Sequence, residues 1–125
     1  MPITFVPRRG IMLVCNFDMG RVAPEMTKKR RVLVVSPRSY NRGHRCVVVP
    51  FSATKPHTVQ APHVFFAAHS YKVLTKDVWA ICECLTSVSC DRLDRVLHGG
   101  GYIAEEISAA DLARVEAGMR HALGL

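Results

Sequence analysis

The feature that most constrains the fold is a series of short apolar segments, each closed by turn-forming or charged residues. Residues 32–35 form a β-branched run that ends at Ser36-Pro37, and residues 46–49 form a second run that ends at Pro50. Runs of this length and composition are typical of buried strands. Residues 39–43 between them have turn composition, so the two runs are expected to form a hairpin. Other segments of the same character are residues 11–17, 64–67 and 78–85.

Helical patterns follow the last of these segments. A short helix is expected over residues 91–97, and a longer one over about 108–123. Ser108 and Asp111 have the spacing of a helix N-terminal cap. The apolar residues that then recur at helical spacing predict one face packed on the sheet. These residues are Leu112, Val115, Met119 and Leu123.

Several short strands with a helix at the end predict a mainly β fold with a C-terminal helix, built on a small, strongly curved sheet or barrel. A chain of 125 residues is long enough for one core and too short for two, so residues 1–125 are expected to form a single domain. Long loops are expected at residues 18–29 and 52–62. The three glycines at 99–101 predict a turn.

The charge balance points to a polyanionic partner. The chain has 17 Lys and Arg against 10 Asp and Glu, which gives a net charge of +7. Such a field attracts RNA, DNA or an acidic protein segment, and binding through phosphates should weaken steeply with salt. The alternative is a solvated cationic surface without a partner. Many of the cations fall in less than a quarter of the chain, namely Lys28, Lys29, Arg30, Arg31, Arg38, Arg42, Arg45 and Lys55.

Other features bear on the compartment and on metals. No apolar run has the length of a membrane span, and the first ten residues lack the apolar stretch of a signal peptide. Five cysteines are an odd number, which favours reduced thiols in a cytoplasmic protein over a disulfide framework. Cys82, Cys84 and Cys90 do not have a standard zinc-ligand spacing. Neither a metal nor another cofactor is therefore expected.

Four segments, in order, resemble one known family. Residues 10–18 read GIMLVCNFD, 30–37 read RRVLVVSP, 48–54 read VVPFSAT and 79–88 read WAICECLTSV. In this order and spacing they are similar to the MazF/PemK family of toxins, and the resemblance covers nearly the whole chain. Arg31 stands at a usual proline, Ser52 at a usual threonine, Ile81 at a usual basic residue and Glu83 at a usual aspartate.

The resemblance implies an SH3-like β-barrel that forms a homodimer and cleaves single-stranded RNA, with sequence specificity and without a metal. In such a reaction the ribose 2′-hydroxyl attacks the adjacent phosphorus, which requires a base, cationic stabilisation and an acid. The dependence on a 2′-hydroxyl selects RNA over DNA. The resemblance also implies a cognate antitoxin, whose acidic, disordered tail would fill the RNA groove and fold on binding.

The resemblance also implies the site residues. Arg30 matches the family's catalytic arginine, and Ser52 retains the hydroxyl of the catalytic threonine. Glu83 is a candidate base, or a residue that holds Arg30 in place. The candidate RNA-binding residues are Lys28, Lys29, Arg31, Arg38, Arg42, Thr54 and Lys55.

Three further side chains are candidates for a role in RNA binding or catalysis, with weaker support from the sequence. Trp79 and Tyr40 could stack on unpaired bases, although a tryptophan on a strand more often packs inside. His63 could act as a general acid or base, and nothing in its spacing separates this role from a structural one.

Two other classes of function stay open at this point. A barrel of the same fold without cleavage activity would bind nucleic acid, or a protein such as a topoisomerase; the residues at Ile81 and Glu83 motivate this reading. A metal-binding regulatory protein is the third reading, and metal analysis of the purified chain would test it.

Overall fold

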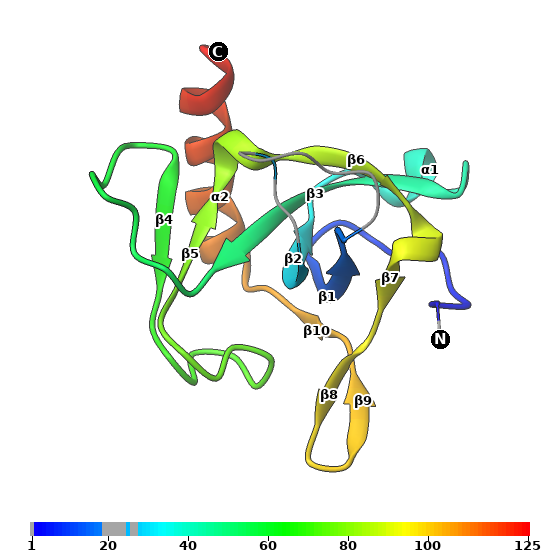
Figure 1. Cartoon of the computed structure of the whole chain (residues 1–125). Coiled ribbons are helices and arrows are strands. Elements are labelled where there is room, and N and C mark those ends of the chain that lie inside the picture. Colours follow the sequence, from blue (N-terminus) through cyan, green and yellow to red (C-terminus); the bar gives the residue numbers. More distant parts are fainter. Residues whose placement is uncertain (1, 19–24, 26–27) are drawn as a thin grey trace.

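The computed structural model describes residues 2–18, 25 and 28–125, and its centre is a curved antiparallel sheet (Figure 1). The strand order is β10-β1-β2-β3-β5-β4, with β6 paired to β3 and β7 paired to β1. The strands are β1 (Ile11–Asn16), β2 (Lys29–Val34), β3 (Arg45–Ser52), β4 (His63–Phe66), β5 (Val78–Ile81), β6 (Thr86–Ser89), β7 (Leu93–Asp94), β8 (Val96–His98), β9 (Gly101–Ile103) and β10 (Glu105–Glu106). The helices are α1 (Arg38–Asn41), η1 (Cys82–Cys84), η2 (Cys90–Arg92) and α2 (Ala109–Leu123). The predicted mainly β fold with a C-terminal helix is confirmed.

Strand β3 joins the two halves of the sheet. Its first half pairs with β6, from Arg45 opposite Ser89 to Val48 opposite Thr86. Its end pairs with β5 instead, with Ser52 opposite Trp79. A strand with different partners along its length bends the sheet toward a barrel, and here it brings β5 beside the start of β2.

The middle of the sheet is buried on both faces, with successive residues of a strand packed in two different cores. In β2, Val32 and Val34 pack with β1, β6 and β7 in one core. Leu33 lies in the other core, which contains β4, β5 and Val115 of α2. The continuous apolar runs in the sequence therefore reflect burial on both sides.

Helix α2 is capped and packed as its sequence predicts. The Asp111 N–H donates to Ser108 Oγ at 3.2 Å, which confirms the N-terminal cap. Val115 is fully buried, and Leu112 and Met119 pack against the same core. The prediction for Leu123 is wrong, because this side chain is exposed at the end of the helix, beyond the sheet.

The chain between residues 78 and 97 differs from its prediction. The segment 78–85 is not one strand, because β5 ends at Ile81 and the 3₁₀ turn η1 leads into β6. The helix expected over 91–97 is wrong: after η2 the chain forms β7 and β8. Its apolar residues are buried in paired strands: Leu93 lies opposite Cys15 of β1, and Val96 lies opposite Ile103 of β9.

Turns and loops complete the fold. Residues 38–41, within the expected hairpin turn, form the short helix α1. Gly99 and Gly100 turn the β8–β9 hairpin with φ of +59° and +82°, a conformation that glycine adopts without strain. The loop expected at residues 18–29 lies mostly outside the described residues. In the part of the chain that the structure describes, no helix is long and apolar enough to span a membrane.

Candidate active site

Strand pairing places Arg30 and Ser52 on the same face of the sheet. Arg30 lies near the start of β2, opposite Cys15 of β1. On the other side of β2, the pairing with β3 ends where Val32 lies opposite Pro50, and Arg30 and Ser52 each lie two residues beyond that pair. Residues two apart on a strand point to the same side, and directly opposed residues of antiparallel strands share a face. Two of the predicted catalytic residues therefore lie on one face of the sheet.

The Arg30 side chain carries an unsatisfied donor. Its Nε is buried and has no hydrogen-bond partner among the described residues. A buried N–H without a partner costs roughly 1–3 kcal/mol. The guanidinium also lies near Cys84: burial and the Glu83 carboxylate raise the pKa of the Cys84 thiol, and Arg30 acts to lower it. Arg30 is thus a partly buried cation with donor capacity left for an anionic oxygen.

Ser52 takes part in a small turn at the end of β3. It is 9% exposed. The Thr54 N–H donates to Ser52 Oγ at 3.2 Å. The Ser52 hydroxyl donates to the Thr54 carbonyl oxygen, with 3.4 Å between the two oxygen atoms. The second contact is long for an O–H donor, so the hydroxyl can turn toward another acceptor at small cost.

Glu83 is held by a histidine. The Gln60 N–H donates to His63 Nδ1 at 3.1 Å, so the ring proton lies on Nε2. That Nε2 lies 2.7 Å from Glu83 Oε2 and donates to it. The His63 side chain is 7% exposed, whereas that of Glu83 is 46% exposed, so a buried ring orients an accessible carboxylate. The sequence gives no sign of this pair, because it depends on β4 pairing with β5, where His63 lies opposite Ile81.

The other face of β2 carries Arg31. Its Nε donates to the Val73 carbonyl oxygen at 2.6 Å, which ties β2 to the 67–77 loop. Two pockets, of about 170 and 370 Å³, flank this position, and Lys29, Arg30 and Arg31 line both. The first is also lined by Thr75 and Lys76, and the second by Arg95 and Tyr102. Sequence reasoning missed these four residues, because they come from loops and a hairpin far from β2 in the chain.

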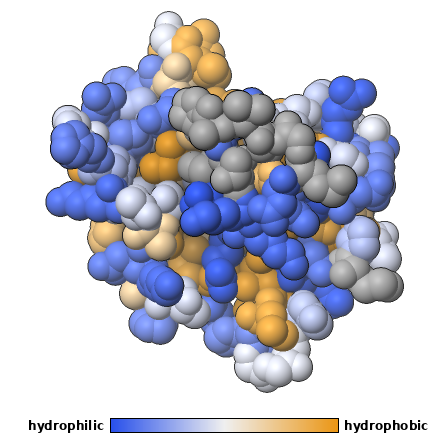
Figure 2. Space-filling view, in the orientation of Figure 1, coloured by the Kyte–Doolittle hydropathy of each residue, from blue (hydrophilic) through white to orange (hydrophobic). Residues whose placement is uncertain are grey.

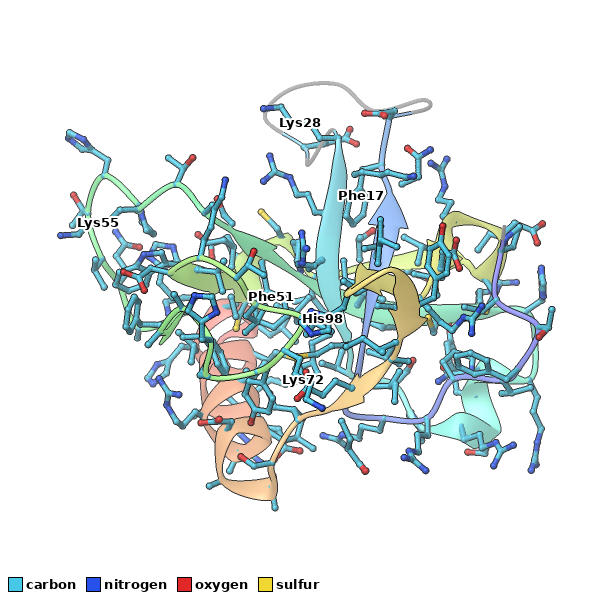
Figure 3. The ribbon with its side chains drawn as sticks, turned by 90° about the horizontal axis from the view of Figure 1, so that it is seen from below. Phe17, Lys28, Phe51, Lys55, Lys72 and His98 are labelled. Carbon is cyan, nitrogen blue, oxygen red and sulfur yellow. The ribbon has the colours of Figure 1, made fainter. Side chains whose placement is uncertain are left out.

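The remaining predicted binding residues fall into two groups. Lys28 and Lys29 lie at the start of β2, and Thr54 and Lys55 on the loop after β3. Figure 3 shows the Lys28 and Lys55 amines turned outward from the sheet. Arg38 and Arg42 lie on and just after α1, beyond the other end of β2, and the structure does not bring them to Arg30.

The family of PemK-like, MazF-like toxins of type II toxin–antitoxin systems matches residues 8–123. The chain belongs to this family. The resemblance that the four sequence segments indicate is thereby confirmed.

Several relatives of this MazF-like chain share most of its length. The Escherichia coli K12 protein YifN is 31% identical, over an alignment that covers 82% of this chain and 82% of YifN. The structure of MazF from Deinococcus radiodurans is 22% identical with a TM-score of 0.74, covering 97% of this chain and 99% of that one. An endoribonuclease from a mycobacterial species, solved with its cognate antitoxin, is 23% identical with a TM-score of 0.65, covering 95% and 96%. These structures show that the MazF-like chain has the fold of those toxins.

Two cysteines of this MazF-like chain have strongly shifted thiols. Burial raises the pKa of Cys46 and Cys82 to about 12, so both thiols are protonated near neutral pH. Within residues 2–18, 25 and 28–125, no three His, Cys, Asp or Glu side chains gather into a group that could hold a metal ion.

Proposed function

We propose that this MazF-like chain is an endoribonuclease that cleaves single-stranded RNA, with sequence specificity and without a metal ion. The observation that carries the proposal is the unsatisfied buried Nε of Arg30, on the same face of the sheet as Ser52. An arginine beside a hydroxyl can bind a phosphate through charge-assisted hydrogen bonds. The family membership and the endoribonucleases among its structural neighbours support the same reading.

The proposed reaction uses the RNA's own nucleophile. The 2′-oxygen attacks the adjacent phosphorus, the bond from phosphorus to the 5′-oxygen breaks, and the products are a 2′,3′-cyclic phosphate and a 5′-hydroxyl. Arg30 would stabilise the negative charge that grows on the phosphoryl oxygens, and the Ser52 hydroxyl would donate to one of them. Glu83 would accept the 2′-hydroxyl proton, with His63 Nε2 holding the carboxylate in place.

The proposed partners follow from charge and family. A net charge of +7 favours RNA and also the acidic segment of a cognate antitoxin. Toxin–antitoxin complexes of MazF from Deinococcus radiodurans have the same fold as this chain in their toxin subunit. We further propose a homodimer that acts in the cytoplasm, where its RNA substrate is found.

The first experiment is cleavage of a long, unstructured RNA by the purified protein in EDTA, with Arg30→Ala beside it. We expect fragments with 5′-hydroxyl ends, and a fall in kcat of about 100- to 1,000-fold for Arg30→Ala, as for the loss of one donor to a transition-state oxyanion. Arg8→Ala is the matched control, because Arg8 is an exposed arginine whose partner is Glu106 on the distant edge strand β10.

Either of two outcomes would overturn the proposal. Intact RNA after incubation with folded, antitoxin-free protein would favour a binding module that has lost cleavage activity. If that protein also inhibited DNA supercoiling, its target would be a topoisomerase. Cleavage that requires added divalent metal would contradict the metal-independent mechanism while leaving the endoribonuclease activity in place.

A further inference from the structure

A row of three side chains crosses three strands at the proposed cleavage site. Phe65 of β4 lies opposite Trp79 of β5, and Trp79 lies opposite Ser52 of β3. Directly opposed residues share a face of an antiparallel sheet. Arg30 lies on the same face, two residues before Val32, which pairs with Pro50 of β3. The row Phe65–Trp79–Ser52 therefore lies on the face of the sheet that also carries the proposed phosphate-binding arginine.

The two rings lie on the outer side of the sheet. Their strand neighbours Val64, Val78 and Ala80 belong to the core beneath, so alternation turns Phe65 and Trp79 away from it. Phe65 is 39% exposed, and Trp79 is partly buried. The interpretation of Trp79 as a core side chain is therefore wrong: the alternation in β5 places Val78 and Ala80 inside and Trp79 outside.

The pair has a fixed geometry. The ring centroids lie 5.1 Å apart at an interplanar angle of 58°, a tilted contact that restrains both side chains. Beneath them, Arg114 of α2 donates from Nη2 to the Phe65 carbonyl oxygen at 2.7 Å, so the edge strand β4 is tied to the helix. A rigid, exposed aromatic pair loses little conformational entropy when a flat ligand stacks on it.

We propose that Phe65 and Trp79 form a stacking platform for an unpaired RNA base next to the scissile phosphate. This inference rests on the proposed function, because it takes Arg30 and Ser52 as the phosphate site. Adjacent strands lie about 4.8 Å apart, and Trp79 is one strand away from Ser52. That spacing lets one strand of RNA place a phosphate at the proposed site and a neighbouring base at the rings.

The composition of the row favours RNA over a second copy of the chain. A surface with aromatic rings at one end and a cation at the other matches the alternation of bases and phosphates in single-stranded nucleic acid. An apolar contact between two copies would instead bring two Arg30 guanidinium groups toward the same interface, where like charges repel.

The test uses the fluorescence of Trp79, the only tryptophan in the chain. The probe is a single-stranded oligonucleotide with 2′-O-methyl ribose throughout, which can bind but cannot be cleaved through a 2′-hydroxyl. We expect binding to quench the fluorescence, and an abasic residue at one position of the probe to abolish most of the quenching. Phe65→Ala should raise the Kd for the probe, measured by anisotropy, about 5- to 150-fold, as expected for the loss of one stacked base.

Two further variants serve as controls for the effect of Phe65→Ala. Phe65→Leu keeps an apolar side chain and should still weaken binding, which separates stacking from loss of folding. Phe5→Ala is the matched control, because Phe5 is a phenylalanine of similar exposure, 41%, near the N-terminus, and its Kd should stay unchanged.

The outcomes separate this inference from the proposed function. The stacking platform would be overturned if the probe bound without quenching the fluorescence of Trp79 and Phe65→Ala left the Kd unchanged. If the same protein cleaved RNA, the endoribonuclease proposal would stand. A protein that neither cleaves RNA nor binds the probe would overturn both. Loss of self-association in Phe65→Ala, seen by sedimentation with an unchanged Kd, would assign the rings to a contact between copies.

Discussion

Both ends of β2 carry cations, in very different surroundings. At the start of the strand, Lys29, Arg30 and Arg31 line two pockets that are also walled by a loop and by the β8–β9 hairpin. Figure 2 shows hydrophilic residues over most of this face, with hydrophobic surface between them above the hairpin. Beyond the other end of the strand, Arg38 and Arg42 are exposed on and just after α1.

The arginines at the two ends of β2 differ in how the neighbouring structure holds them. Helix α1 is anchored by Asn41, whose Nδ2 donates to the Pro7 and Ser36 carbonyl oxygens at 2.8 and 3.0 Å, so its arginines are left outside. At the start of β2, by contrast, Arg30 and Arg31 are partly buried and face opposite sides of the sheet. Clustering of charge in the sequence is therefore a weaker guide to a site than the face and depth at which each charge lies.

The largest expected difference between the two ends is in catalysis, and a substitution that keeps the charge reveals it. Arg30→Lys should lower kcat for RNA cleavage about 10- to 100-fold, because a lysine cannot reproduce paired hydrogen bonds to a phosphate, each worth about 1.5–3 kcal/mol. Arg38→Lys should change the rate less than about threefold, because an exposed phosphate contact tolerates either cation. Initial rates at saturating RNA measure both; equal effects would remove the distinction between the two ends.

The next difference is in stability. Arg31→Met removes the hydrogen bond to the buried Val73 carbonyl oxygen and should lower the free energy of unfolding by about 1–3 kcal/mol. Arg42→Met, at an exposed position, should change it by less than about 0.5 kcal/mol. Urea denaturation followed by circular dichroism measures both. A stable Arg31→Met variant would show that the contact with the 67–77 loop contributes little to the stability of the fold.

Much of the fold could be predicted because local signals agree with it. The β-branched run at 32–35 and the capped helix from Ser108 form where the sequence places them. The two-residue strand β7 could not be predicted, since Leu93 becomes a strand residue only by pairing with Cys15, which is remote in the sequence. Elements of this length have too few residues for a periodic pattern, and their pairing decides their conformation.

The candidate site shows the same division. Arg30 and Ser52 could be singled out by resemblance to a family, and the register of β2 and β3 then explains why they share a face of the sheet. The contact between His63 and Glu83 could not be predicted, because it depends on the pairing of β4 with β5 and on the position of Glu83 in the turn η1, after β5. The face occupied by Trp79 could not be predicted either: alternation defines two faces, and only the packed structure shows which one is buried.

The smallest expected difference between the two ends of β2 is electrostatic, and Cys84 reports it. Four of the five cysteines are buried, and Cys84 is partly accessible, so iodoacetamide should alkylate Cys84 first in the folded protein. Burial, followed by the Glu83 carboxylate, raises the pKa of this thiol, and Arg30 acts to lower it. Arg30→Ala removes a cation that stabilises the thiolate, so the pKa of Cys84 should rise further.

The alkylation rate should therefore reach its half-maximum at a higher pH in Arg30→Ala than in the wild type, and Arg38→Ala should leave the profile unchanged. Glu83→Gln supplies the opposite sign, because loss of the carboxylate should lower the pKa of the thiol. The three profiles map the field around the proposed phosphate site without RNA, so they test the placement of Arg30 independently of catalysis. An Arg38→Ala profile that shifts as far as that of Arg30→Ala would mean that the field at Cys84 comes from the overall charge and not from the neighbouring guanidinium.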